Sequence, residues 1–380
     1  MRSDLTKWTI GPFLGFPQGF SHGITQGPIK LELFIDGEVI VHGTVETGYL
    51  YRKLEKAIRL HPWVSTLSYA GRLDPENAVF GELVLCLAVE KIGKTEVPLR
   101  AQRIRVVLSE LARISNHLSF FVSVARTVDS EIMAQYVLRD REKILDLFEL
   151  LTGSRFSLGF LCYGGVRKDI TDGFIERVLE VCELIQKRIK EYNDIYTFNA
   201  AFIKRSKKVG KLSKEIIINY GVTGPNARAS GVSYDVRKEQ PYCGYEKIDF
   251  KVPTGIFGQG DPSCGDVYHR FLLRVFEIEQ SIEILKQATE QIPVGRFNVN
   301  ESVQSLNVPS GEANARVESS RGVLECHVVS DGRAQPNSVQ FWPPSVASAA
   351  VISKVIEGIK IEDLLVVLAS LNISVSEIDQ

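Results

Sequence analysis

The sequence predicts a protein of the α+β class that is mainly α, with a core bundle of long helices flanked by small β elements near the N-terminus and the C-terminus. Apolar residues recur every three or four positions across 97–128, as they do in a buried helix. β-rich stretches at 29–43 and 314–332 lie on either side of the helical region. With 380 residues, of which 44% are hydrophobic and 24% charged, the chain can bury a substantial core.

The N-terminal part predicts a β-hairpin. In "IKLELFIDGEVIVHG" at 29–43, two β-rich runs flank the pair Asp36-Gly37. An Asp-Gly pair favours a two-residue hairpin turn, because both turn positions take positive φ. We assign residues 1–75 to an N-terminal β-hairpin region.

The region 76–310 is expected to form the helical core. Pro98 suits the first turn of the clearest helix, and the next helix starts at the capping candidate Ser130 and stops at Gly153. Four long helices of this kind predict a bundle. Their expected ranges are 97–128, 130–153, 171–202 and 265–292.

The C-terminal part returns to β character in "NARVESSRGVLECHVVSDG" at 314–332, where Gly322 and Asp331-Gly332 are turn candidates. The remaining sequence predicts two helices and an extended end, "SVSEIDQ". We assign 311–380 to a C-terminal β/α region and expect the three regions to form one integrated domain.

Charge and hydropathy narrow the possible partners. The formal net charge of −1 gives no general attraction to nucleic acid or to an anionic membrane surface. The longest apolar runs, such as "LVLCLAV" at 83–89, are shorter than the roughly 18–20 residues needed to span a bilayer, and the N-terminus has no signal-peptide core. We therefore expect no nucleic-acid partner, no membrane span and a cytoplasmic location.

The cysteines and histidines do not form a local metal-ligand set. No two of the six cysteines stand in a C-x-x-C, and the six histidines show no H-E-x-x-H spacing. We expect reduced thiols and no metal bound by this chain's own ligands. The sequence also lacks a P-loop, a G-x-S-x-G elbow and a G-x-G-x-x-G motif, so it gives no support for a self-sufficient hydrolase or nucleotide-binding enzyme.

Two polar segments leave a structural and a functional interpretation open. The glycine-rich segment "YGVTGPNARASGVSYDVRKEQPY" at 220–242 is expected to be a loop between the third and fourth long helices. Its small residues and Arg228 suit close approach to an anion or cofactor, but also an ordinary turn with a solvated arginine. In "YAGRLDPENA" at 69–78, Asp74 is a helix-cap candidate and Arg72 can pair nearby.

Taken together, the segments resemble one family over nearly the whole chain: the large-subunit relatives of nickel–iron hydrogenases and, within them, the 49-kDa (D-type) subunit of respiratory complex I. The matching pieces follow the family's order and include "LFIDGEVI", "TGYLYRKLEKAI", "YAGRLD", "LAVEKIGKTEVPLRAQRIRVVLSELARISNHL", "REKILDLFELLTGSR", "GGVRKDI", "GPNARASGVSYDVRKEQPY", "GDVYHRFLLRVFEIEQSI" and the terminal "SEIDQ". The resemblance implies a hydrogenase large-subunit-like fold.

Two regions distinguish the branches of this family. Hydrogenases hold nickel and iron with four thiolates from two C-x-x-C motifs, whereas the corresponding regions here are "AGRLDPEN" and "LNISVSEIDQ", which contain no cysteine. A thiolate-bound nickel–iron centre cannot form without these soft ligands. The terminal E-[VI]-D-[RQ] pattern is similar to that of the complex I branch, in which the resemblance implies a quinone-reaction chamber.

The resemblance also implies roles for individual residues. Arg72, Asp74 and Arg228 match positions near the 4Fe-4S cluster of a partner subunit, where a positive charge favours the reduced cluster. His22, in "GFPQGFSHGI", is the candidate for contact with the quinone headgroup, and Asp129 is the nearest carboxylate to a family aspartate. These residues form the expected site.

The sequence departs from the family pattern at three site positions. The tyrosine that follows R-L-D and hydrogen-bonds the quinone is Pro75, the aspartate that partners the quinone histidine aligns with Thr127, and a histidine near the cluster aligns with Ser157. The phenol and the histidine–carboxylate pair are the groups that would protonate a reduced quinone.

The resemblance implies a core subunit of a complex I-like NADH-quinone oxidoreductase that couples electron transfer to proton translocation. Quinone would be the substrate, and the expected partners are a small iron–sulfur subunit (B-like), C-like and I-like peripheral-arm subunits and an H-like membrane subunit. These would hold the chain at the cytoplasmic face of the inner membrane. Two alternatives remain: a divergent paralogue that uses another electron acceptor, and a structural subunit that links a peripheral arm to a membrane arm.

Overall fold

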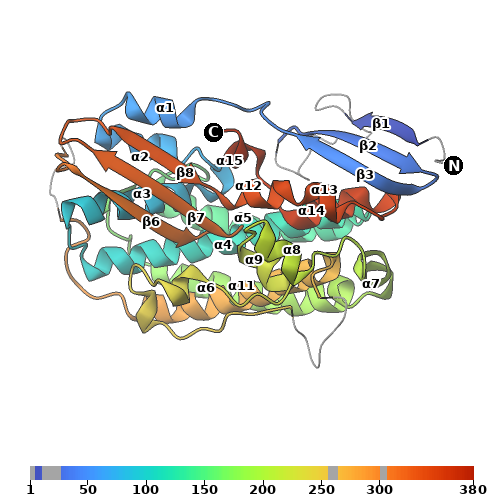
Figure 1. Cartoon of the computed structure of the whole chain (residues 1–380). Helices are drawn as coiled ribbons and strands as arrows, with labels where there is room; N and C mark the ends of the chain where they lie inside the picture. Colours follow the sequence, from blue (N-terminus) through green and yellow to red (C-terminus); the bar gives the residue numbers. More distant parts are fainter. Residues whose placement is uncertain (1–4, 11–26, 256–263, 300–305) are drawn as a thin grey trace.

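The computed structural model describes residues 5–10, 27–255, 264–299 and 306–380, and it shows a long helical body with a three-stranded antiparallel sheet at either end (Figure 1). The α+β, mainly α fold class predicted from the sequence is confirmed. Among the described residues, no helix is long and apolar enough to cross a membrane.

The N-terminal sheet contains the predicted hairpin. Its strands pair in the order β1 (Thr6–Ile10), β2 (Lys30–Asp36) and β3 (Val39–Glu46), and Gly37 takes the positive φ of 60° that the turn requires. Strand β1 was not predicted. Alternating side chains of β2, from Leu31 to Ile35, are buried against the helical body.

Helix α4 lies at the centre of the helical body. It packs along α5 and α11, and most of its side chains are buried, which explains why its apolar periodicity was so clear. Three of the four long helices predicted from periodicity are confirmed, and α3 extends the bundle. The bounds are α3 (Ala78–Gly93), α4 (Leu99–Thr127), α5 (Glu131–Thr152) and α11 (Val267–Glu290).

The prediction of a single long helix at 171–202 is wrong. Helix α6 (Phe174–Tyr192) runs into a π-helical turn at Asn193–Thr197, and α7 (Ala200–Ser206) begins after it. The break follows from Asn199, whose side chain caps α7 by accepting a hydrogen bond from the backbone N–H of Ala201 at 2.8 Å.

The glycine-rich segment at 220–242 was predicted to be a loop, but it contains the short helices α9 (Gly224–Ala229) and α10 (Val236–Glu239). Gly224 has φ +68°, and a Cβ built there would lie 2.3 Å from the Cα of Gly322. The small residue therefore lets α9 contact the chain's own turn between two C-terminal strands. Helix α8 (Lys214–Asn219) precedes this segment.

The C-terminal sheet pairs in the order β6, β7 and β8, and α3 packs against β6 and β7. The prediction of an extended C-terminal end is wrong, because residues 375–378 form a short helix. The bounds are β6 (Gly311–Glu318), β7 (Val323–Ser330), β8 (Ser338–Trp342), α12 (Pro344–Ala350), α13 (Ile352–Val355), α14 (Leu364–Leu371) and α15 (Val375–Ile378).

Candidate functional site

The C-terminal tail folds back onto the segment that follows helix α2 (Trp63–Ala70). Ser376 Oγ donates a hydrogen bond to the carbonyl of Leu73 at 3.0 Å. The Asp379 carboxylate accepts the backbone N–H groups of Gly48 and Leu50 at 2.7 and 2.9 Å. The segments "AGRLDPEN" and "LNISVSEIDQ" are thus neighbours in this chain, and neither contains a cysteine.

Asp74 and Arg321 form the centre of this contact. Asp74 is buried and accepts hydrogen bonds from the Glu76 backbone N–H and the Asn77 side chain, so it caps the 3₁₀ turn at Pro75–Asn77. Its Oδ2 also accepts from Arg321 Nε at 2.9 Å. Arg321 Nη1 donates to the carbonyl and side-chain oxygens of Asn372 at 2.6 and 2.7 Å, which ties the turn between β6 and β7 to the tail.

Glu377 adds a second buried carboxyl group. Ser345 Oγ donates to its Oε2, and the side chain is 1% exposed. Burial, together with the nearby charge of Asp74, raises the pKa of Glu377 to about 8. One guanidinium therefore stands among two carboxyl groups, one of which can hold a proton near neutral pH.

Glu377→Gln should reduce the pH dependence of stability. The folded-state pKa of Glu377 lies above the ordinary value of 4.5. Its contribution to the free energy of unfolding is therefore fully present below pH 4.5 and is lost as the pH rises to about 8. Urea unfolding at several pH values should show that the free energy of unfolding of the wild type falls by up to a few kcal/mol across this pH range. That of the variant should fall by less. Exposed Glu180→Gln is the control, and equal pH profiles for all three proteins would contradict the assignment.

Arg72 lies on the surface next to this buried contact. It lines a pocket of about 410 Å³ with Arg167, His61 and Tyr69. His61 Nε2 and Tyr69 Oη are 3.0 Å apart. Within the described part of the chain, no carboxylate forms an ion pair with Arg72 or Arg167. The pocket therefore presents two guanidinium groups to a partner or a ligand.

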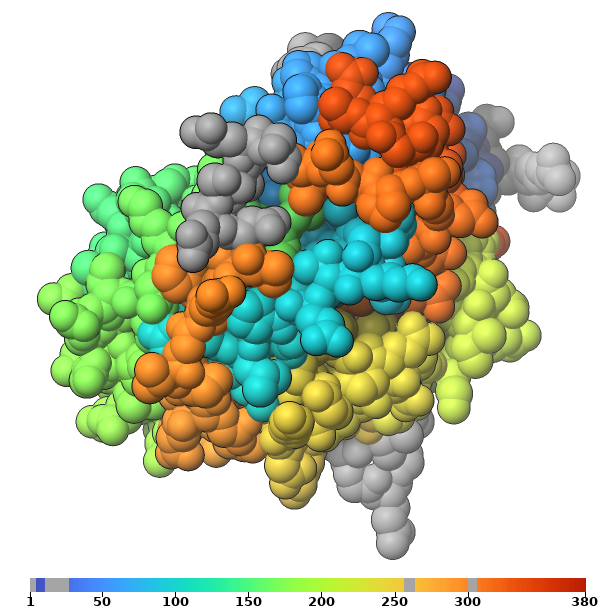
Figure 2. All heavy atoms as spheres, turned by 90° about the vertical axis from the view of Figure 1, so that its left-hand side faces the viewer, coloured from blue at the N-terminus to red at the C-terminus, as the bar shows by residue number. Residues whose placement is uncertain are grey.

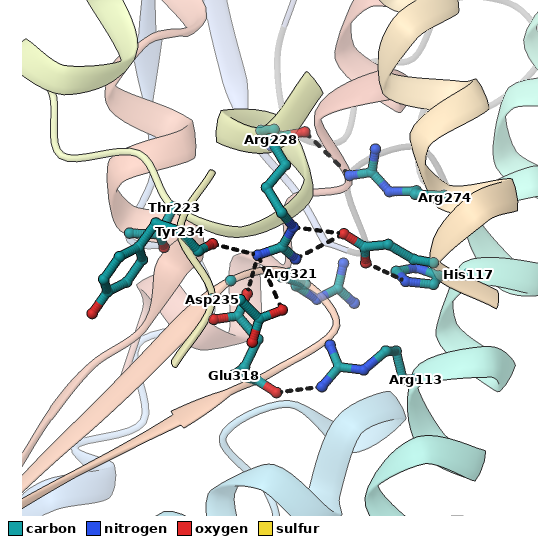
Figure 3. A network of polar contacts seen from close by, with 12 residues as sticks. Arg113, His117, Thr223, Arg228, Tyr234, Asp235, Arg274, Glu318 and Arg321 are labelled. Carbon is teal, nitrogen blue, oxygen red and sulfur yellow. Dashed lines mark hydrogen bonds and ion pairs between the residues drawn. The ribbon is translucent and has the colours of Figure 1, made fainter. Parts of the chain in front are cut away.

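Arg228 lies in the interior, in a second polar cluster (Figure 3). Its Nε donates to Glu277 Oε1 at 2.8 Å and its Nη1 to Glu318 Oε1 at 2.7 Å, so it joins α9 to α11 and β6. Together with Arg228, two further guanidinium groups and four carboxylates are buried in this cluster. They are Arg113, Arg228, Arg237, Glu110, Asp235, Glu277 and Glu318.

His117 closes one side of this cluster. Its Nε2 lies 2.9 Å from Glu277 Oε2, and burial lowers its pKa to about 4, against the opposing effect of Glu277. Burial acts to raise the pKa of Glu277, but the charge of Arg228, the hydrogen bond from His117 and the charge of Arg113 together outweigh it and hold that pKa well below its ordinary value. The arrangement is a neutral histidine bonded to an ionised carboxylate, with Arg228 as the cation.

The remaining site residues predicted from the sequence lie elsewhere. His22 falls outside the residues that the structure describes. Asp129 is exposed in the turn after α4, with φ 58°, and Thr127 Oγ1 donates to the carbonyl of Val124 at 2.7 Å. Pro75 is exposed at the start of its 3₁₀ turn. The structure thus brings Arg72 and Asp74 to the tail contact and places Arg228 in the adjacent cluster.

Over the described ranges, no group of three or more histidine, cysteine, aspartate or glutamate side chains is placed to hold a metal ion. The six cysteines are free thiols, and all but Cys264 are buried.

Sequence reasoning missed Arg321, Arg167 and the carboxylates Glu277 and Glu318. A local sequence pattern could have pointed to Arg321, because it stands beside Gly322 in a turn between two predicted strands. No local pattern pointed to Glu277 or Glu318, because they lie 49 and 90 residues from Arg228 in the sequence.

Comparison with known proteins gives one consistent result. The family model described as the 49-kDa subunit of respiratory-chain NADH dehydrogenase matches residues 130–306 and 298–380. The chain is 38% identical over 361 residues to the D-type subunit of NADH-quinone oxidoreductase from Desulforamulus reducens, covering 95% of this chain and 96% of that protein. It is 35% identical to the corresponding subunit of Bacillus mycoides and 34% identical to that of Bacillus anthracis, in each case over 95% of this chain and 97% of the relative.

Proposed function

We propose that this chain forms the quinone-side chamber of an NADH-quinone oxidoreductase, beside the iron–sulfur cluster of a partner subunit. The proposal starts from the family: the chain belongs to the family of the 49-kDa subunit of respiratory-chain NADH dehydrogenase. The observation that best supports this is the contact between the tail and the segment after α2. There, Arg321 joins Asp74 to the tail that carries Glu377, and Asp74 and Glu377 stand in the two segments that the resemblance matches to the thiolate motifs of hydrogenases.

The chemistry of this contact favours proton handling over metal binding. Carboxylates and a guanidinium are poor ligands for the soft metals that thiolates hold. Glu377, with a pKa of about 8, can hold a proton at its carboxyl group and release it at neutral pH. Reduction of a quinone to a quinol takes up two electrons and two protons, and the proposal assigns the electrons to the partner's cluster and proton supply to this chain.

The roles of His22 and Asp129 follow the family resemblance. His22 is proposed to contact the quinone headgroup, and Asp129 is the carboxylate proposed to assist it in place of Thr127. With proline at position 75 there is no phenol to donate a proton, so the buried Glu377 is the stronger candidate for a proton source.

The exposed pocket around Arg72 is proposed to face the small iron–sulfur subunit. Two guanidinium groups that form no ion pair with a described carboxylate would stabilise the added electron of a nearby cluster, although Arg167 also acts on the charge of Glu82. The other proposed partners are the C-like and I-like peripheral-arm subunits and the H-like membrane subunit, which would hold the chain at the cytoplasmic face of the membrane. Coupling to proton translocation is part of the same proposal.

Quinone-dependent turnover in the assembled complex tests the proposal. His22→Ala should abolish turnover with quinone while reduction of the cluster by NADH persists, and exposed His42→Ala is the matched control. Turnover that is insensitive to His22→Ala would favour another electron acceptor. An intact complex that turns over no acceptor would favour a structural subunit.

Arg72→Ala should lower the midpoint potential of the neighbouring cluster. A positive charge within several ångströms favours the reduced form, and its removal is expected to shift the potential by tens of millivolts, on the order of a tenfold change in the equilibrium. A redox titration followed by electron paramagnetic resonance measures this. Arg177→Ala, a surface change on α6, is the control, and an unchanged midpoint for Arg72→Ala would exclude the cluster-facing role.

A further inference from the structure

The segment at 194–215 carries a local excess of positive charge. Its sequence, "DIYTFNAAFIKRSKKVGKLSKE", contains six basic residues and two acidic ones, although the whole chain has a formal net charge of −1. Helix α7 lies in the middle of this segment, and α8 begins near its end. Five of the six basic residues are exposed, and we refer to them as the basic patch: Lys204, Arg205, Lys208, Lys211 and Lys214.

The basic patch has few counterions within the chain. Among the described residues, no carboxylate forms an ion pair with Lys204, Lys208 or Lys214. Arg205 does have an acidic neighbour: burial raises the pKa of Asp363, and the charge of Arg205 opposes that rise. Most of the positive charge of the patch therefore faces the solvent, where it can attract an anionic surface despite the nearly neutral chain.

Two large apolar side chains are exposed beside the basic patch. Ile195 and Phe198 are 56% and 58% exposed. Ile195 belongs to the π-helical turn at Asn193–Thr197, and Phe198 follows that turn directly. The turn packs against α7 through the rings of Tyr196 and Phe202, whose centroids are 4.3 Å apart. Because these two rings are buried, the turn leaves Ile195 and Phe198 on the surface next to α7.

We infer that the basic patch, together with Ile195 and Phe198, binds the surface of a membrane that contains anionic lipids. Lysine and arginine side chains are attracted to the phosphate groups of such lipids. Apolar side chains enter the boundary between the headgroups and the acyl chains. Two signals of this kind are what stable attachment to a membrane surface requires, and this part of the chain presents both side by side.

The place of the patch in the fold agrees with the proposed function. Helix α7 lies at the same end of the molecule as the N-terminal sheet (Figure 1). His22, the proposed quinone contact, stands between strands β1 and β2 in the sequence. A respiratory quinone is dissolved in the membrane, so a membrane at this end of the molecule would serve both sites. This orientation rests on the proposed function, whereas the charge and the exposure of the patch do not.

Flotation of the full chain with lipid vesicles tests the inference. The probes are vesicles of phosphatidylcholine alone and vesicles of phosphatidylcholine and phosphatidylglycerol in equal amounts. The wild type should bind the anionic vesicles at least about tenfold more tightly than the neutral ones. K204E/R205E should weaken binding to the anionic vesicles by about tenfold or more, because it replaces two attractive charges with repulsive ones.

The matched control is K56E/R59E, which makes the same charge change in the last turn of another short helix, α1 (Leu54–Arg59). Both residues are exposed. Helix α1 belongs to the opposite end of the molecule, which faces the viewer in Figure 2, where blue N-terminal residues and the orange-red C-terminal sheet meet at the top. K56E/R59E should bind like the wild type. Equal loss in the two double variants would overturn the inference, since the attraction would then come from the net charge of the chain.

A second pair of variants separates a lipid surface from an acidic protein. I195S/F198S should also weaken binding to anionic vesicles by about tenfold, because the apolar side chains that enter the membrane are lost. L60S/L99S, which changes two other exposed apolar residues, should retain binding. Vesicle binding that is insensitive to I195S/F198S, or displaced by soluble polyglutamate of equal charge, would overturn the inference in favour of an acidic protein partner.

Absence of binding of the wild type to the anionic vesicles would overturn the inference outright. Neither quinone nor a partner subunit enters this measurement. A failure here is therefore distinct from a failure of the proposed function, which the turnover of His22→Ala in the assembled complex tests.

Discussion

Arg228→Ala is expected to destabilise the folded chain by about 3–5 kcal/mol, because it leaves buried carboxylates without their cation. Arg228 is fully buried, and its guanidinium bonds Glu277 and Glu318 on two different elements. The desolvation cost of those carboxylates remains when the arginine is removed, while their attraction to it is lost. Urea unfolding of the purified chain measures the change.

Companion variants separate charge from packing. Arg228→Lys should retain part of the stability, since it keeps the charge but loses the planar fork that bonds two carboxylates. Arg228→Met combined with Glu277→Gln should cost less than the sum of the two single changes, because a charge is removed from each side. Exposed Arg177→Ala should change stability by less than about 0.5 kcal/mol. A cost for Arg228→Ala no larger than that of Arg177→Ala would contradict the role of the cluster.

The position of Arg228 also bears on its proposed effect on the partner's cluster. Its charge is already shared with Glu277 and Glu318 inside the chain. We therefore expect the midpoint potential to respond more to Arg72→Ala than to Arg228→Ala, since Arg72 is exposed and forms no ion pair with a described carboxylate. The same redox titration ranks the two variants.

The elements that could be predicted are those whose residue pattern lies within one short stretch of the sequence. The hairpin of β2 and β3 followed from Asp36-Gly37 between β-rich runs, and α4 followed from apolar residues along most of its length. Strand β8 was missed because its five residues have no turn pair of their own and are held by β7 and α1. The tail was expected to be extended, and it forms α15 where it packs against α12.

The candidate site was only partly predictable for the same reason. Arg72 and Asp74 stood out by their motif, and the capping role of Asp74 followed from the residues around it. The partner of Asp74, Arg321, lies 247 residues away, so only the folded chain shows the pair. The sequence also left open what the glycines of 220–242 approach. Gly224 approaches the chain's own Gly322, a contact between two backbones that no composition reveals.

Gly224→Ala should destabilise the chain far more than Gly221→Ala, although both glycines have nearly the same φ, +68° and +67°. The strain of a left-handed alanine, about 1–2 kcal/mol, is common to both variants. At Gly221 nothing lies within 4 Å of an added Cβ, whereas at Gly224 the Cα of Gly322 lies at 2.3 Å and the carbonyl oxygen of Arg321 at 2.6 Å. Backbone cannot rotate away as a side chain can, so α9 or the β6–β7 turn must shift.

That shift should add about 1–3 kcal/mol or more to the cost of Gly224→Ala. It should also disturb the bonds of Arg321 to Asp74 and Asn372, since the displaced turn carries Arg321. Urea unfolding of the two variants measures the difference, and quinone turnover in the assembled complex should fall for Gly224→Ala while Gly221→Ala retains it. Equal stability of the two variants would mean that the contact between α9 and the turn yields at little cost, and that the glycine at 224 is required for its backbone conformation alone.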